Sequence, residues 1–151
     1  AAAPQEFPEN KPVDRPGIGW SCGWSERHVA FVAGLGTFGL SGGLITRRGI
    51  AHRLGSVVTD AEIPPTPRPY GDDPFAWCLK LARGTCGACL RRCPAGSVGE
   101  TVAARNRPAC LKWAYEVVRT EGAERYKMER VAGCGLCQTA VPCESRNPTE
   151  S

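Results

Sequence analysis

Cysteine is the residue whose number and spacing in this chain point most directly to chemistry. The 151-residue sequence has nine cysteines, and all but Cys22 lie between residues 78 and 143. Cys86 begins the pattern C-x2-C-x3-C-P, and Cys134 begins the pattern C-x2-C-x5-C. Two cysteines in one turn can face the same small inorganic group, so these spacings are typical of iron–sulfur or zinc sites. The cysteines are Cys22, Cys78, Cys86, Cys89, Cys93, Cys110, Cys134, Cys137 and Cys143.

The first pattern is a variant of the bacterial cluster-binding run. That run is C-x2-C-x2-C-x3-C-P, and its last cysteine ligates the other cluster in two-cluster ferredoxins. In this chain Arg83 occupies the position of the first cysteine, and Cys78 is its natural substitute. We expect Gly87 and Gly135 to permit the tight backbone inside the two C-x2-C pairs.

Three kinds of site could use these thiols. Two [4Fe–4S] clusters need eight thiolates, and eight cysteines follow residue 77. A structural zinc site would use the two C-x2-C pairs and leave four of the eight unused. Disulfides are the third alternative, and the C-x2-C pairs and the lack of any sign of secretion argue against them. A Rieske centre is excluded because His28 and His52 lie far from the cysteine runs, and Cys22 is expected to be a spare thiol.

The elements that position the cysteines are expected to be short, because the chain contains 18 glycines and 13 prolines. Residues 1–19 are predicted to be a proline-rich arm or linker. Residues 20–74 are predicted to hold a helix over 26–33, with Ser25 as N-cap, and a β-hairpin. In that hairpin, residues 44–46 and 50–59 flank a turn that contains Gly49. The prolines of residues 62–74 indicate a stiff connector at the domain boundary.

Residues 75–151 are predicted to be the cysteine-bearing domain, built of short helices and loops. One helix is expected over 75–82 and ends before Gly84. A second is expected over 106–121, with Asn106 as N-cap and Gly122 after its end. An apolar stripe on that helix follows helical spacing and consists of Leu111, Ala114, Tyr115 and Val118. The predicted fold class is α+β: a ferredoxin-like module preceded by a small helix-plus-hairpin segment.

Several segments of the chain together resemble one family of iron–sulfur proteins. This family is related to epoxyqueuosine reductase and the corrinoid-dependent reductive dehalogenases, and the resemblance covers roughly residues 20–147. The segments are WSERH at 24–28, AGLGTFGL at 33–40, GLIT at 43–46, GSVVT at 55–59, PPTPRPY at 64–70, GCGLCQ at 133–138 and VPCES at 141–145.

The resemblance implies a ferredoxin-like domain with two [4Fe–4S] clusters and interleaved ligands. One cluster would be held by Cys78, Cys86, Cys89 and the distant Cys143. The other would be held by Cys93, Cys110, Cys134 and Cys137. Because ligands of each cluster come from both cysteine runs, loss of one cluster is expected to unfold the region around the other.

The family's corrinoid enzymes carry a cobalamin-binding domain before the cluster domain. Residues 20–62 resemble only the last part of that domain, and about 60 residues are too few to enclose a corrinoid. Cobalamin is therefore expected only if a further N-terminal domain precedes this segment. No residue here matches the family's catalytic acid or proton donor, so we name no catalytic residue.

The formal net charge of +4 is mild and does not indicate a nucleic acid partner. Two oxidised clusters would add about −2 each and bring the total near zero. Six cations lie in sequence around the ligands, either as a solvated face or as a docking patch for an acidic flavodoxin- or ferredoxin-type carrier. They are Arg83, Arg91, Arg92, Arg105, Arg107 and Lys112. No apolar run approaches the ~20 residues of a membrane span, and the expected location is the cytoplasm.

The function predicted first is electron transfer: an iron–sulfur protein that relays single, low-potential electrons to a reductive active site, as part of an oxidoreductase. The second hypothesis is a fragment of a cobalamin-dependent reductase, which the resemblance of residues 20–62 motivates. The third, from a different class, is a zinc-stabilised binding module.

Overall fold

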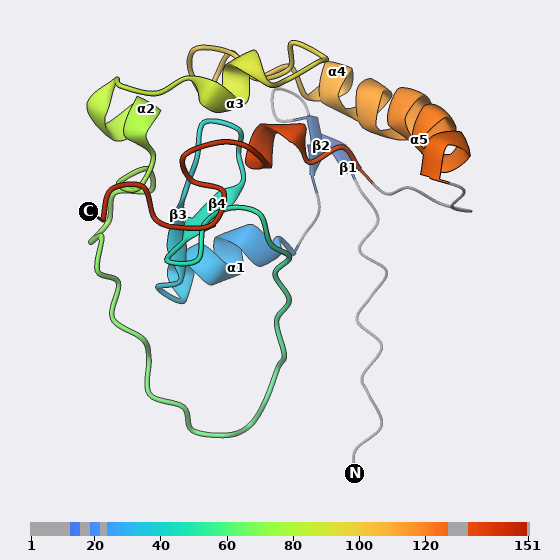
Figure 1. Cartoon of the computed structure of the whole chain (residues 1–151). Coiled ribbons are helices and arrows are strands. Elements are labelled where there is room, and N and C mark those ends of the chain that lie inside the picture. The colour runs from blue at the N-terminus through green and yellow to red at the C-terminus, as the bar shows by residue number, and fades with distance from the viewer. Residues whose placement is uncertain (1–12, 16–18, 22–23, 127–132, 151) are drawn as a thin grey trace.

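The structure is a computed structural model that describes residues 13–15, 19–21, 24–126 and 133–150. Its elements are β1 (Val13–Arg15), β2 (Gly19–Ser21), α1 (Glu26–Val32), β3 (Gly36–Phe38), β4 (Leu44–Thr46), α2 (Leu79–Arg83), α3 (Ala88–Arg91), α4 (Arg107–Lys112), the π-helix η1 (Trp113–Val117), α5 (Val118–Tyr126) and the 3-10 helix η2 (Leu136–Gln138). Helices α2 to α5 follow one another along the top of the molecule, and α1 and the β3–β4 sheet lie below them (Figure 1). None of the helices in these ranges is long and apolar enough to cross a membrane.

The segment predicted to be a proline-rich arm includes a short strand. β1 pairs antiparallel with β2, and Val13 lies opposite Ser21. Residues 1–12 and 16–18 of this segment lie outside the described residues, as does Cys22. The predicted division of the chain at residues 19 and 74 stays a prediction.

The helix predicted over residues 26–33 is confirmed as α1. The carbonyl of Ser25 accepts the first backbone N–H groups, from His28 at 2.9 Å and Val29 at 3.0 Å. The Ser25 hydroxyl does not cap the helix but lies 2.7 Å from Nδ1 of His28. Gly34 follows with φ of +80°, a left-handed conformation that ends the helix.

The hairpin predicted from residues 44–46 and 50–59 is wrong. β4 pairs instead with β3, the strand before it, so that Phe38 lies opposite Leu44. Residues 50–59 contain no strand in the described structure. The backbone N–H of Ile50 donates to the carbonyls of Cys143 and Glu144, at 2.8 and 3.1 Å, and its side chain is buried. Ile50 thus packs in the core beside the C-terminal segment. The chain consequently leaves the sheet after Gly49.

Helix α2 is shorter than the helix predicted over residues 75–82. It begins at Leu79 with Cys78 as its N-cap, because the chain before Cys78 forms turns, one closed by a 2.9 Å hydrogen bond from the Cys78 N–H to the Phe75 carbonyl. Gly84 ends the helix with φ of +69°, as the sequence predicts.

The helix predicted over residues 106–121 is confirmed at its start and wrong at its end. The Asn106 side chain accepts the N–H of Ala109 at 3.0 Å, and the helical segment runs through α4 and η1 into α5, past Gly122. The π-helical turn η1 shifts the residues after it relative to a regular α-helix. Ala114 is buried as predicted, whereas Tyr115, which was placed on the same stripe and lies within this π-helical turn, is 58% exposed.

One hydrophobic core joins residues on both sides of the predicted boundary at residue 74. Its buried members are Leu40, Ile45, Ile50, Tyr70, Trp77, Cys78, Val98 and Val141. Tyr70 stacks on Phe31 and meets Trp77 edge-on, with ring centroids 5.4 and 5.3 Å apart. The backbone N–H of Trp77 donates to the buried hydroxyl of Thr37, on β3, at 2.9 Å. The core therefore anchors the backbone next to Cys78.

Candidate functional site

The eight cysteines after residue 77 are all free thiols in this structure. Cys78 precedes α2, and Cys86, Cys89 and Cys93 lie before, within and after α3. Cys110 lies in α4. The segment that contains η2 passes beneath α3 and carries Cys134, Cys137 and Cys143 (Figure 1). Chain segments far apart in the sequence thus carry these thiols.

A first group consists of Cys78, Cys86, Cys89 and Cys143. All four line one cavity of about 30 Å³, which the core residues Ile45, Ile50 and Val141 also line. The pKa of the Cys143 thiol is raised to about 12, chiefly by burial and then by the charges of Cys78, Cys89 and Cys86. The four thiols therefore line one small, largely apolar cavity.

Burial and neighbouring thiols also raise the pKa of Cys89, the member of this group on α3. Burial is the main cause that raises its pKa to about 11, followed by the charges of Cys78, Cys86 and Cys137. The last of these belongs to the second group, so Cys89 lies where the two groups approach each other.

A second group consists of Cys93, Cys110, Cys134 and Cys137. Burial raises the pKa of the Cys137 thiol, the guanidinium of Arg105 lowers it, and the charges of the other three thiols raise it. Cys93 also accepts a hydrogen bond, because the backbone N–H of Ser97 lies 3.2 Å from its Sγ. Such N–H donors stabilise a thiolate more than a neutral thiol.

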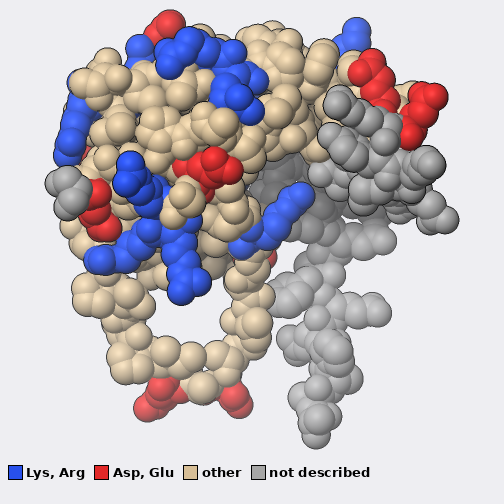
Figure 2. All heavy atoms as spheres, viewed as in Figure 1, with Lys and Arg blue, Asp and Glu red and all other residues tan. Residues whose placement is uncertain are grey.

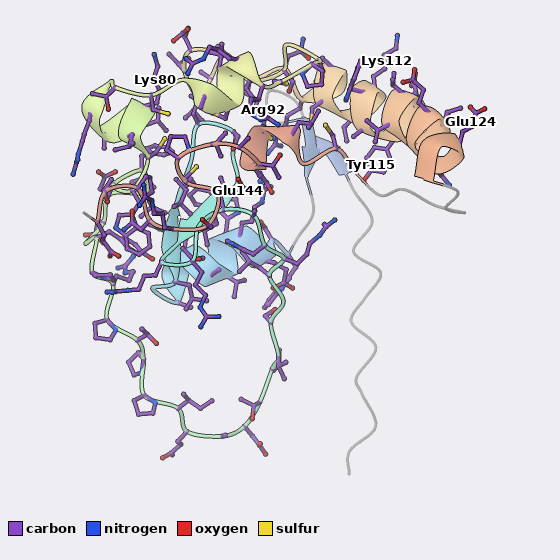
Figure 3. The ribbon with its side chains drawn as sticks, viewed as in Figure 1. Lys80, Arg92, Lys112, Tyr115, Glu124 and Glu144 are labelled. Atoms are coloured by element: carbon purple, nitrogen blue, oxygen red, sulfur yellow. The ribbon has the colours of Figure 1, made fainter. Side chains whose placement is uncertain are left out.

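Hydrogen bonds hold the loops that carry the second group. Nε of Arg92, at the end of α3, donates to the carbonyl of Leu136 at 3.1 Å (Figure 3). Gly135, between Cys134 and Leu136, has φ of +73°, as expected for a tight C-x2-C turn. The same expectation for Gly87 is wrong, because its φ of −165° is extended backbone that any residue adopts.

The loop that carries Cys143 is braced from two sides. The carboxylate of Glu144 accepts the N–H of Ala140 at 2.8 Å, which closes the loop on itself (Figure 3). Gly49 approaches the same loop so closely that an added Cβ would lie 2.2 Å from the carbonyl oxygen of Glu144. The sequence predicted Gly49 only as a glycine in a turn. Its φ of +90° and its contact with Glu144 are seen only in the structure.

The described residues contain no set of three His, Cys, Asp or Glu side chains arranged around a single metal ion. A tetrahedral zinc site needs four ligands within about 2.3 Å of one ion. A [4Fe–4S] cluster is larger, because each thiolate binds a different iron atom. Four of the eight thiols line one small cavity, and a soft thiolate set of this size suits an iron–sulfur cluster.

No protein-family model, curated protein or solved structure matches this chain. The resemblance to relatives of epoxyqueuosine reductase therefore stays a prediction drawn from the sequence.

Proposed function

We propose that this chain is an electron-transfer protein of ferredoxin-like type with two [4Fe–4S] clusters. The first cysteine group would hold one cluster and the second group the other. The observation that carries the proposal is that four of the eight free thiols, Cys78, Cys86, Cys89 and Cys143, line one small cavity although they come from distant parts of the chain. Bound clusters would supply one-electron redox chemistry.

The chain's own residues would tune the two sites differently. The first group is lined by aliphatic core residues, and an apolar surrounding favours the more oxidised, less negative state. The second group has the guanidinium of Arg105 beside Cys137 and the Ser97 N–H on Cys93, which stabilise added negative charge. The reduction potential of the second site is therefore expected to be higher than that of the first.

The partner we propose is an acidic, flavodoxin- or ferredoxin-type redox protein. Lys and Arg side chains gather on the surface over α3, with others at the edge near α2 (Figure 2). Lys80 is paired with Glu100 at 2.7 Å, whereas Arg83 and Arg91 are exposed. An acidic protein that docks on these arginines would lie close to the thiols on α3, which shortens the path for an electron. Because thiols stay reduced in the cytosol, we place this role in the cytoplasm.

Reductive titration under anaerobic conditions tests the proposed function. Two clusters that each accept one electron give about two electron equivalents per chain, with a loss of visible absorption and a paramagnetic signal from reduced iron. A protein that takes up no electrons and has no visible absorption after reconstitution with iron and sulfide would contradict it. In that case a colourless protein with one bound zinc ion would favour the binding module.

A further inference from the structure

A second cavity lies between α1, β3 and the loop before α4. Its volume is about 590 Å³, within the roughly 300–1,000 Å³ typical of pockets that hold small molecules. Three phenylalanines, Phe31, Phe38 and Phe75, line it. The rings of Phe31 and Phe38 lie 5.7 Å apart, and the His28 ring packs against Phe38 with centroids 4.9 Å apart. The cavity thus offers aromatic surface of the kind on which a flat ring stacks.

The charged side chains on the cavity wall are all positive. They are the guanidinium groups of Arg27, Arg105 and Arg107, and no acidic residue lines the cavity within the described part of the chain. Arg27 is held in place because its Nη1 donates to the carbonyl of Gly42. Nε of Arg105 is buried and has no hydrogen-bond partner among the described residues. The unsatisfied Nε of Arg105, with two further guanidinium groups on the same wall, suits an anionic group.

We propose that this cavity binds a small molecule that combines a flat aromatic ring with a phosphate or carboxylate group. The phenylalanines stack against the ring, and the arginines pair with the anionic group, for which a planar guanidinium is the best-suited partner. Such a site is separate from the cysteine groups, and its existence does not depend on the clusters.

Flavin mononucleotide, riboflavin and inorganic phosphate serve as probes, added to the full chain under anaerobic conditions and followed by calorimetry. Flavin mononucleotide carries both the ring and the phosphate, whereas the other two carry one each. We expect it to bind at least tenfold more tightly than either. Equal affinity for riboflavin and flavin mononucleotide, or no binding of any probe at millimolar concentration, would overturn the proposal.

A matched pair of variants isolates the charge. Ala103 is exposed, lines the cavity and has a side chain that makes no hydrogen bond. Ala103→Glu adds a negative charge at the wall, and Ala103→Gln adds a side chain of the same size without charge. We expect Ala103→Glu to weaken flavin mononucleotide binding about fivefold or more, and Ala103→Gln to change it less than twofold. Equal effects of the two variants would refute the role of the positive potential.

Iron content separates this proposal from the proposed function. Both Ala103 variants should retain wild-type iron, because the residue lies outside both cysteine groups. A chain that binds flavin mononucleotide but no iron would support the cavity and contradict the proposed clusters. The converse result would contradict the cavity alone.

Discussion

Replacement of Thr37 by valine removes one hydroxyl group from the core at nearly constant volume. Thr37 is completely buried, and its Oγ1 accepts the backbone N–H of Trp77 at 2.9 Å. In Thr37→Val this N–H lies away from water without an acceptor, at a cost of about 1–3 kcal/mol. We expect the free energy of unfolding to fall by about 2 kcal/mol, equivalent to a decrease of about 4–8 °C in Tm for a chain of this length.

Thr37→Ser is the matched control, because serine keeps the acceptor and loses only the methyl group. That loss costs about 1 kcal/mol, so the serine variant should be the more stable of the two. Chemical denaturation of anaerobically purified protein, followed by tryptophan fluorescence, measures both variants. If Thr37→Val unfolds at the wild-type denaturant concentration, or is more stable than Thr37→Ser, the hydrogen bond does not anchor the backbone next to Cys78.

Three further predictions concern the cysteine loops and the basic surface. Gly49→Ala places a Cβ against Glu144 at φ of +90° and should cost more than about 1 kcal/mol of stability in urea denaturation, whereas Gly55→Ala, in open space, should be neutral. Cys143→Ser should reduce the iron content from about eight to about four atoms per chain or fewer, and unchanged iron would remove Cys143 from the ligand set. Arg91→Glu should lower the rate at which an acidic carrier reduces this protein at low salt, and the difference should disappear at high salt. Arg119→Glu, on α5, should lower that rate much less. Equal rates for both charge reversals would contradict docking over α3.

Local signals predicted the starts and ends of several helices. Ser25 and Asn106 stand at the starts of helical segments, and Gly34 and Gly84 end helices with positive φ. These features depend on a few neighbouring residues, so a single sequence contains them. The pairing of residues 44–46 was mispredicted because it depends on where Ile50 packs, and that is decided by contacts with the chain near Cys143.

The cysteine groups show the same division between local and distant information. Spacing identified the two C-x2-C pairs, but the approach of Cys143 to Cys78 depends on the whole fold. The division into two sets of four was inferred from a family resemblance and stays a prediction, although the four thiols of the first set line one cavity. The cavity of Phe31, Phe38 and Arg105 had no sequence signal, because its residues come from three separated segments.

The number of iron and acid-labile sulfide atoms per chain tests the proposed clusters most directly. The protein is purified without oxygen, or reconstituted with iron and sulfide and freed of excess reagent, before the iron, sulfide and zinc are measured. Two [4Fe–4S] clusters predict about eight iron atoms and about eight sulfide ions per chain, with no zinc. About four iron atoms or fewer, or one zinc ion without sulfide, would contradict the two-cluster site.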